Sequence, residues 1–145
     1  SCMHKSFDIP REIKHKFVVF SHKKFQLNIE EFPRMTNNAK DIDQVLNFLG
    51  SGETILTSSY HGAYWGILLG RKVLAFPFSS KFYTLKHKPG IYPISKWMKS
   101  ENEFYCQTDE WENFLQDCQS YPESLQECRQ SNQWYYSQVL ELLKK

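Results

Sequence analysis

The chain of 145 residues lacks several features that would place it in a known class at once. No apolar run approaches the roughly 18 residues of a membrane-spanning helix, so no membrane span is expected. The first 16 residues are polar and basic without an apolar stretch, which argues against a secretory signal peptide. The phosphate-binding loop, the dinucleotide-binding glycine motif and the nucleophile-elbow motif are all missing.

Spacings typical of metal ligands are missing as well. The chain has four cysteines, Cys2, Cys106, Cys118 and Cys128, and no two of them form a C-x-x-C pair. Four histidines show no ligand spacing: His4, His15, His22 and His87. The sequence therefore predicts no metal site and no cofactor, and the cysteines are expected to be reduced thiols of a cytoplasmic protein.

The residues that are present are typical of one folded domain. Hydrophobic residues make up 41% of the chain and aromatic residues 16%, which argues against disorder and for a substantial core. A net charge of +2 gives no reason to expect a nucleic-acid partner. Because the chain begins with Ser1 rather than Met, we expect it to be part of a longer protein. Residues 1–15 are expected to be loose and residues 16–145 to form a single domain.

The small net charge hides two blocks of opposite sign. Residues 71–100 contain seven basic residues and no acidic one: Arg71, Lys72, Lys81, Lys86, Lys88, Lys96 and Lys99. Residues 101–127 contain eight acidic residues and no basic one. Either the blocks are two solvated faces that attract each other, or the basic block lines a site for an anionic ligand.

Strands are predicted where short runs are rich in β-branched and aromatic residues. These runs are residues 16–20, 53–57 and 72–76, and residues 25–29 alternate as an edge strand would. Residues 32–38 hold a proline and paired asparagines, which is typical of a loop.

Helices are predicted where apolar residues recur at helical spacing. The predicted ranges are 39–49, 60–69, 109–118 and 124–143. Asn37 or Asn38 is expected to cap the first, and the serines before residue 60 the second. The second helix carries Gly62, Gly66 and Gly70 along one line, which indicates close approach to a sheet or a ligand.

The order strand, helix, strand over residues 53–76 predicts a right-handed crossover and a parallel sheet. The predicted fold class is therefore α/β, a Rossmann-like parallel sheet flanked by helices. Ligands of such sheets bind beyond the carboxyl ends of the strands, near helix N-termini.

Two segments follow strands in this way and supply the candidate site residues. The first segment holds Ser58, Ser59, Tyr60, His61 and Gly62, and the second holds Ser79, Ser80 and Lys81. His61 is the candidate catalytic residue, because a histidine at a helix start can donate a proton or a hydrogen bond to a ligand oxygen. The other seven are candidates for substrate binding, since hydroxyls, free backbone N–H groups and an ammonium all favour an anion. Packing, capping and solvation are the competing interpretations.

Residues 54–82, which read TILTSSYHGAYWGILLGRKVLAFPFSSKF, resemble the C-terminal half of the polysaccharide pyruvyl transferase family. The pattern of that family looks like a strand, an S-x-H-G element, a helix of small residues and a second strand. Its fold is similar to that of the two-domain GT-B glycosyltransferases. The resemblance implies that His61 contacts the pyruvyl donor, phosphoenolpyruvate, and that the acceptor is a saccharide of cell-surface exopolysaccharide. It also implies an N-terminal domain that supplies the other wall of the cleft.

Two positions depart from the family pattern, so two other functions stay open. Ser59 stands where many members have arginine, and Lys72 replaces a usual proline. One alternative is the corresponding half of a GT-B-type glycosyltransferase that uses a nucleotide sugar. The other is a non-catalytic Rossmann-like module that binds a nucleotide or a protein.

Overall fold

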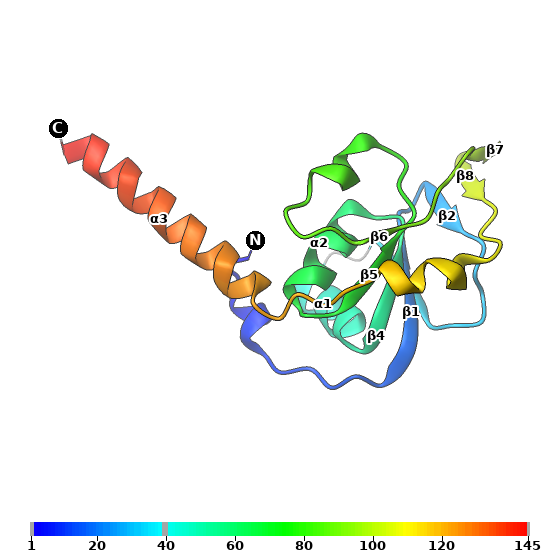
Figure 1. Cartoon of the computed structure of the whole chain (residues 1–145), viewed down its shortest axis with the longest axis horizontal. Coiled ribbons are helices and arrows are strands. Elements are labelled where there is room, and N and C mark those ends of the chain that lie inside the picture. Colours follow the sequence, from blue (N-terminus) through cyan, green and yellow to red (C-terminus); the bar gives the residue numbers. More distant parts are fainter. Residues whose placement is uncertain (1, 39–40, 145) are drawn as a thin grey trace.

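The structure is a computed structural model that describes residues 2–38 and 41–144. Its centre is a parallel sheet of five strands in the order β3-β1-β4-β5-β6 (Figure 1). The strands are β1 (His15–Ser21), β3 (Arg34–Thr36), β4 (Gly52–Thr57), β5 (Lys72–Ala75) and β6 (Gly90–Ile91). The predicted α/β class with a parallel sheet is thus confirmed, and it is Rossmann-like in its architecture.

The central strand-helix-strand unit forms as its sequence predicts. β4 and β5 pair in parallel, with Thr57 opposite Ala75, and α2 (Tyr60–Leu68) makes the crossover between them. Gly66 faces the sheet, because a Cβ placed on it would lie 2.6 Å from Ile55 Cδ1 and 3.0 Å from Val73 Cγ2. Close packing of the helix on the sheet therefore explains this glycine.

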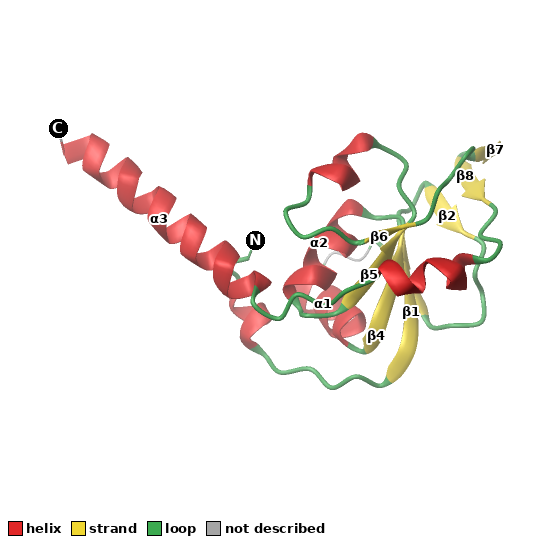
Figure 2. Ribbon diagram, in the orientation of Figure 1, coloured by secondary structure: helices red, strands yellow, loops and turns green. Residues whose placement is uncertain are grey.

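Helices α1 and α2 cover one face of the sheet (Figure 2). α1 (Ile42–Gly50) buries Val45, Leu46 and Leu49 in the core cluster on that face. Its N-cap is Asp41, whose side chain accepts a hydrogen bond from the N–H of Asp43. The predicted cap at Asn37 or Asn38 is therefore wrong, and the two predicted first residues of the helix, 39 and 40, lie outside the described residues.

A second core cluster covers the opposite face, where Leu56 and Leu74 meet Trp111 and Cys118. It is closed by the 3-10 helix η3 (Trp111–Asp117) and by a small sheet of order β2-β8-β7. That sheet consists of β2 (Phe25–Leu27), β8 (Glu103–Cys106) and β7 (Met98–Ser100), and Figure 1 shows it beside the main sheet. β2 is an edge strand as predicted, and the predicted helix over 109–118 is a shorter 3-10 helix.

The stretch predicted as a loop, residues 32–38, contains the edge strand β3. Its three residues pair in parallel with β1, Val19 opposite Arg34 through Ser21 opposite Thr36. A strand this short carries no alternation that a sequence pattern can detect, and its pairing with β1 alone defines it.

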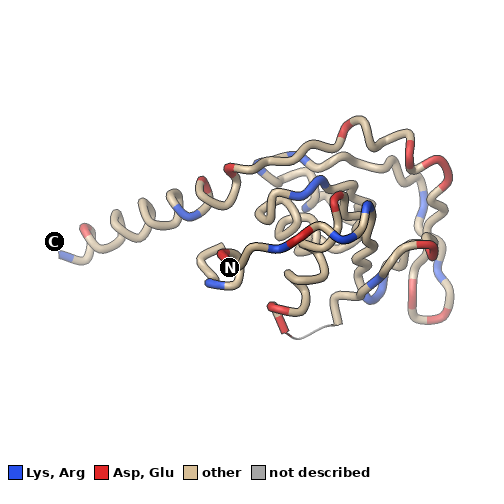
Figure 3. Tube along the Cα trace, turned by 90° about the horizontal axis from the view of Figure 1, so that it is seen from below, with Lys and Arg blue, Asp and Glu red and all other residues tan. Residues whose placement is uncertain are grey.

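The long C-terminal helix α3 (Ser124–Lys144) extends away from the body (Figure 1). Its first turns pack on the body: Ser124 donates a hydrogen bond to the carbonyl oxygen of Ile67 (2.8 Å), and Leu125 contacts the core. Its outer turns expose large apolar side chains, with Trp134 65% and Leu143 77% exposed. Figure 3 shows how few charged residues this outer part carries.

Within the segment expected to be loose, Cys2, Ser6 and Phe7 are buried against the body, whereas residues 8–10 and 12–15 are exposed. Cys2 and Phe7 are buried in the core cluster beside α1 and α2, and the segment includes the 3-10 helix η1 (Lys5–Asp8). Cys2 is bonded to Cys128 of α3 as a disulfide, so the expectation of four reduced thiols is wrong for this pair. Their separation of 126 residues explains why no local spacing indicated the bond. Cys106 and Cys118 are free and buried.

Among the described residues, no helix is both long enough and apolar enough to cross a membrane. The outer part of α3, which carries Glu141 and Lys144, does not reach that criterion.

Candidate functional site: the carboxyl edge of the sheet

The carboxyl ends of β1, β4 and β5 lie side by side. Phe20 pairs with Thr57, and Thr57 pairs with Ala75, so the three strands end at one level. The next residues of each strand therefore meet at this edge: His22 after β1, the serine pair after β4, and Phe78 after β5. This is the edge at which the sequence predicts the site.

The first serine pair builds the edge rather than facing solvent. Ser58 is fully buried; its Oγ donates to the carbonyl oxygen of Phe25 (2.6 Å) and accepts from the N–H of His22 (2.9 Å). Ser59 is also buried and caps α2, accepting a hydrogen bond from the N–H of Gly62 (3.2 Å). These two hydroxyls thus hold the loop after β1 and the start of α2 in place.

Gly62 is required at this point for a steric reason. A Cβ on it would lie 2.6 Å from both the Phe20 ring and Thr57 Oγ1. Thr57 Oγ1 in turn donates to the carbonyl oxygen of Phe20 (2.6 Å), so the helix start is pressed against the two strand ends. The backbone of α2 thereby begins directly over the edge of the sheet.

His61 is exposed on the first turn of α2, and Lys81, in the 3-10 helix that follows β5, lies close enough for its charge to act on His61. The Lys81 Nζ lies 4.2 Å from the centre of the Tyr60 ring, a cation–π contact that places the ammonium beside the helix start. The His61 ring packs on Trp65 at 5.1 Å between ring centres. Partial burial, and secondly the charge of Lys81, lower the pKa of His61 below its ordinary value. The neutral imidazole is therefore more favoured here than in an ordinary exposed histidine.

The second serine pair is placed differently from the first. Ser79 precedes and Ser80 begins the 3-10 helix η2 (Ser80–Thr84), and both are exposed. Ser79 makes no side-chain capping hydrogen bond. The structure thus puts Tyr60, His61, Ser79, Ser80 and Lys81 within reach of solvent, and it encloses Ser58, Ser59 and Gly62 beneath them.

The basic block does not gather at this edge. Lys81 lies at the helix start, but Arg71 lies near the opposite, amino end of the strands, where it donates to the carbonyl oxygens of Gly50 and Arg11. Lys86 pairs with Glu127 at 3.2 Å, which joins the basic block to the acidic one. One ion pair thus joins the two charge blocks, and Lys81 is the residue of the basic block that lies beside the start of α2.

His22 belongs to this edge, and the sequence analysis missed it. Its Nδ1 accepts a hydrogen bond from the N–H of Lys24 (3.0 Å), which leaves the proton on Nε2. Partial burial, followed by the charges of Lys23 and Lys24, lowers the pKa of His22. His22 follows a strand, as His61 does, but no helix starts there, so the signal of a histidine at a helix start was missing.

This edge is suited to an anion. The residues after β1, β4 and β5 supply two imidazoles, three lysines and the free N–H groups of a helix start, and residues 22–25, 58–62 and 76–82 hold no acidic residue. Within the part of the chain that the structure describes, no group of three or more residues is arranged to hold a metal ion.

Comparison with known proteins adds no assignment: no family model, curated protein or solved structure matches the chain.

Proposed function

We propose that this chain is the donor-binding domain of a transferase that acts on cell-surface polysaccharide, and that the transferred group is the pyruvyl group of phosphoenolpyruvate. The observation that carries the proposal is the placement of His61 and Lys81 near the N-terminus of α2, on an edge whose three segments contain no acidic residue. The resemblance of residues 54–82 to the polysaccharide pyruvyl transferases supports the choice of donor.

The residues divide the chemistry of that transfer between them. Lys81, the exposed serines and the helix start bind the phosphate and carboxylate of the donor. His61 donates a proton to the methylene carbon, which becomes a methyl group. One hydroxyl of the sugar then adds to the neighbouring carbon and a second displaces phosphate, so that both oxygens end in the cyclic ketal. Of the two hydroxyl protons, one returns to His61 and the other leaves with the phosphate.

The lowered pKa of His61 is compatible with this role. Partial burial and, secondly, the charge of Lys81 lower the pKa of His61, which disfavours its charged form. A bound donor brings phosphate and carboxylate charges next to His61. These negative charges raise the pKa of His61, so the imidazole becomes protonated when the donor binds. Binding and activation of the acid are thereby coupled.

Equilibrium binding of phosphoenolpyruvate to the chain tests the donor site. We expect Lys81→Ala to weaken binding by about tenfold, as loss of a charged hydrogen-bond donor does. Lys14→Ala is the matched control, since that exposed lysine precedes β1 at the opposite edge of the sheet and its removal should leave binding unchanged. Binding of a nucleotide sugar in place of phosphoenolpyruvate would instead establish the glycosyltransferase alternative, and binding of neither would contradict the proposal.

Turnover tests the role of His61. In the enzyme that contains this domain, His61→Ala is expected to lower turnover by about 10²–10⁴-fold, the usual contribution of a general acid. Since His61 is exposed, circular dichroism and the melting midpoint should stay as in the parent protein. Full activity of His61→Ala would remove His61 from the mechanism.

A further inference from the structure

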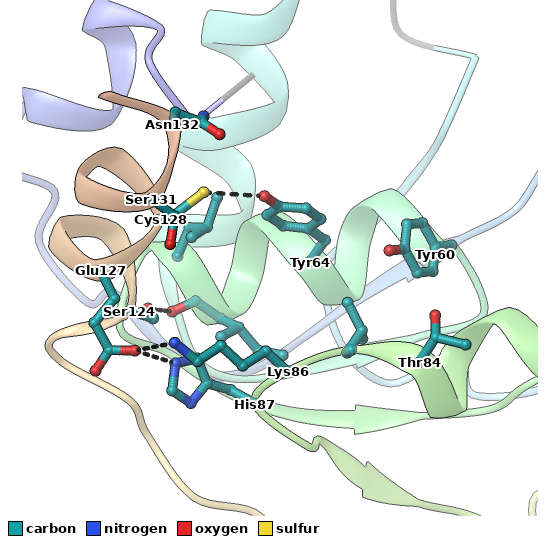
Figure 4. A pocket seen from close by; sticks show the side chains of 13 residues that line it. Tyr60, Tyr64, Thr84, Lys86, His87, Ser124, Glu127, Cys128, Ser131 and Asn132 are labelled. Atoms are coloured by element: carbon teal, nitrogen blue, oxygen red, sulfur yellow. Dashed lines mark hydrogen bonds and ion pairs between the residues drawn. The ribbon is translucent and has the colours of Figure 1, made fainter. Parts of the chain in front are cut away.

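A pocket of about 270 Å³ lies outside the edge site, between α2, the loop after η2 and the first turns of α3 (Figure 4). Its floor is apolar, formed by the buried side chains of Ile67, Leu68 and Leu85. Tyr60 and Tyr64 of α2 line it with their rings, and Glu127, Ser131 and Asn132 line it from α3. The walls thus combine aromatic surface with hydroxyl, amide and carboxylate groups.

The charged groups of this pocket neutralise one another. One oxygen of Glu127 lies 3.2 Å from Lys86 Nζ and 2.9 Å from His87 Nε2, as the dashed lines in Figure 4 show. The negative charge of the carboxylate is therefore matched by Lys86. An ionic ligand would have to displace these partners, whereas an uncharged polar ligand can use the second carboxylate oxygen as an acceptor.

Other polar groups at the rim of the pocket have atoms that can form hydrogen bonds with a ligand. The Asn132 amide nitrogen donates to Cys2 Sγ (3.1 Å), which leaves its carbonyl oxygen as an acceptor. Ser131 is exposed, and its hydroxyl can both donate and accept. The ligand that matches an apolar floor, tyrosine rings and a rim of this kind is a ring with C–H faces and hydroxyl edges.

The size of the pocket limits the ligand to one such ring. Its volume lies just below the about 300–1,000 Å³ of sites that hold drug-sized molecules. It also adjoins the donor site, because Tyr60 lines the pocket while its ring carries the Lys81 ammonium. A molecule in the pocket and an anion at Lys81 would thus share one wall.

We infer that this pocket binds a single uncharged pyranose ring, as the binding site for a saccharide unit of the acceptor next to the donor site. The inference rests on the proposed function for the choice of a saccharide among polar ring compounds. The pocket itself is independent of the donor's identity, since none of its lining residues is His61 or Lys81.

Ligand-detected NMR on the whole chain tests the inference with the methyl pyranosides of glucose, galactose and mannose as probes. We expect at least one of them to bind. Ser131→Trp should weaken that binding by about tenfold or more, because the indole fills the pocket from an exposed helix position. Gln130→Trp is the matched control, since the neighbouring residue is also exposed and does not line the pocket.

Further measurements separate the possible failures. Both tryptophan variants should melt as the parent chain does, and Glu127→Gln, which keeps the shape of the side chain, should also weaken pyranoside binding. Binding of phosphoenolpyruvate without any pyranoside would overturn this inference and leave the proposed function standing. Binding of a pyranoside that Ser131→Trp and Glu127→Gln do not affect would place the sugar elsewhere and overturn it too. If neither phosphoenolpyruvate nor any pyranoside binds, both this inference and the proposed function are wrong.

Discussion

Two histidines at the carboxyl edge share one electrostatic property. The pKa values of His22 and His61 are both lowered, mainly by partial burial and further by neighbouring lysines. Residues 22–25, 58–62 and 76–82 contain no carboxylate that would oppose this shift.

This property predicts how stability depends on pH. A histidine whose pKa is lower in the folded state binds fewer protons there than in the unfolded chain, so the free energy of unfolding falls as pH falls through about 6.5. Urea unfolding between pH 5 and 8 should show this slope, and the double variant His22→Gln with His61→Gln should have a smaller one. His15→Gln at the amino end of β1 is the control. A slope that the double variant leaves unchanged would contradict the lowered pKa values.

At the scale of elements, α2 both packs closely on the sheet and contributes residues to the two proposed sites. Gly62 and Gly66 bring its backbone against β1, β4 and β5, and Ser59 caps it directly over the strand ends. The same helix turns Tyr60 and Tyr64 toward the pocket against α3. Its position on the sheet therefore sets the geometry of both proposed sites.

Substitution of Gly66 tests how closely α2 must pack. Leucine would gain about 1 kcal/mol of helix propensity over glycine, but its Cβ would lie 2.6 Å from Ile55 Cδ1 and force the helix outward. We expect Gly66→Leu to lower the free energy of unfolding by about 1–3 kcal/mol, as overpacking does. Ser137→Leu on the exposed part of α3 should change it little. An unchanged denaturation midpoint for Gly66→Leu would show that the close approach has no energetic role.

At the scale of the whole molecule, the two ends of the chain are tied together. The disulfide between Cys2 and Cys128 joins the N-terminal segment to α3, and Arg129 adds a hydrogen bond to the carbonyl oxygen of Cys2 (2.9 Å). Arg129 also pairs with Asp8 of η1. These contacts seat the first turns of α3 on the body, beside the pocket that Cys128 lines.

Reduction of this disulfide should destabilise the chain. A bond across 126 residues restricts the unfolded state strongly, and such bonds typically contribute about 2–4 kcal/mol. The midpoint of urea unfolding should fall when a reductant is added to the parent chain, and the Cys2→Ser variant should not respond. Burial raises the pKa of Cys106 to about 12 and of Cys118 to about 11, so these thiols stay unreactive until the chain unfolds.

Thiol titration in denaturant gives an independent check of the pairing. Two thiols should react before reduction and four afterwards, since the chain has four cysteines and two are free. Four reactive thiols in the unreduced, denatured chain would disprove the disulfide.

The sequence by itself determined the elements whose signals are local. The runs that form β4, α2 and β5 carry their β-branched residues, serine cap and glycines within about 25 residues, so their type, order and parallel pairing follow from short-range chemistry. His61 and Lys81 could be selected for the same reason, because each lies within a few residues of the end of a predicted strand.

Only the tertiary structure decided the features that depend on distant residues. β3 is too short to show a pattern and is defined by its pairing with β1, and the disulfide joins residues 126 positions apart. The sequence showed hydroxyls at Ser58 and Ser59, but which atoms they bond depends on how the loop after β1 folds over them. The pocket against α3 is lined by residues as distant in the sequence as Tyr60 and Asn132. Contacts of this kind depend on the packing of the whole chain, so no local pattern encodes them.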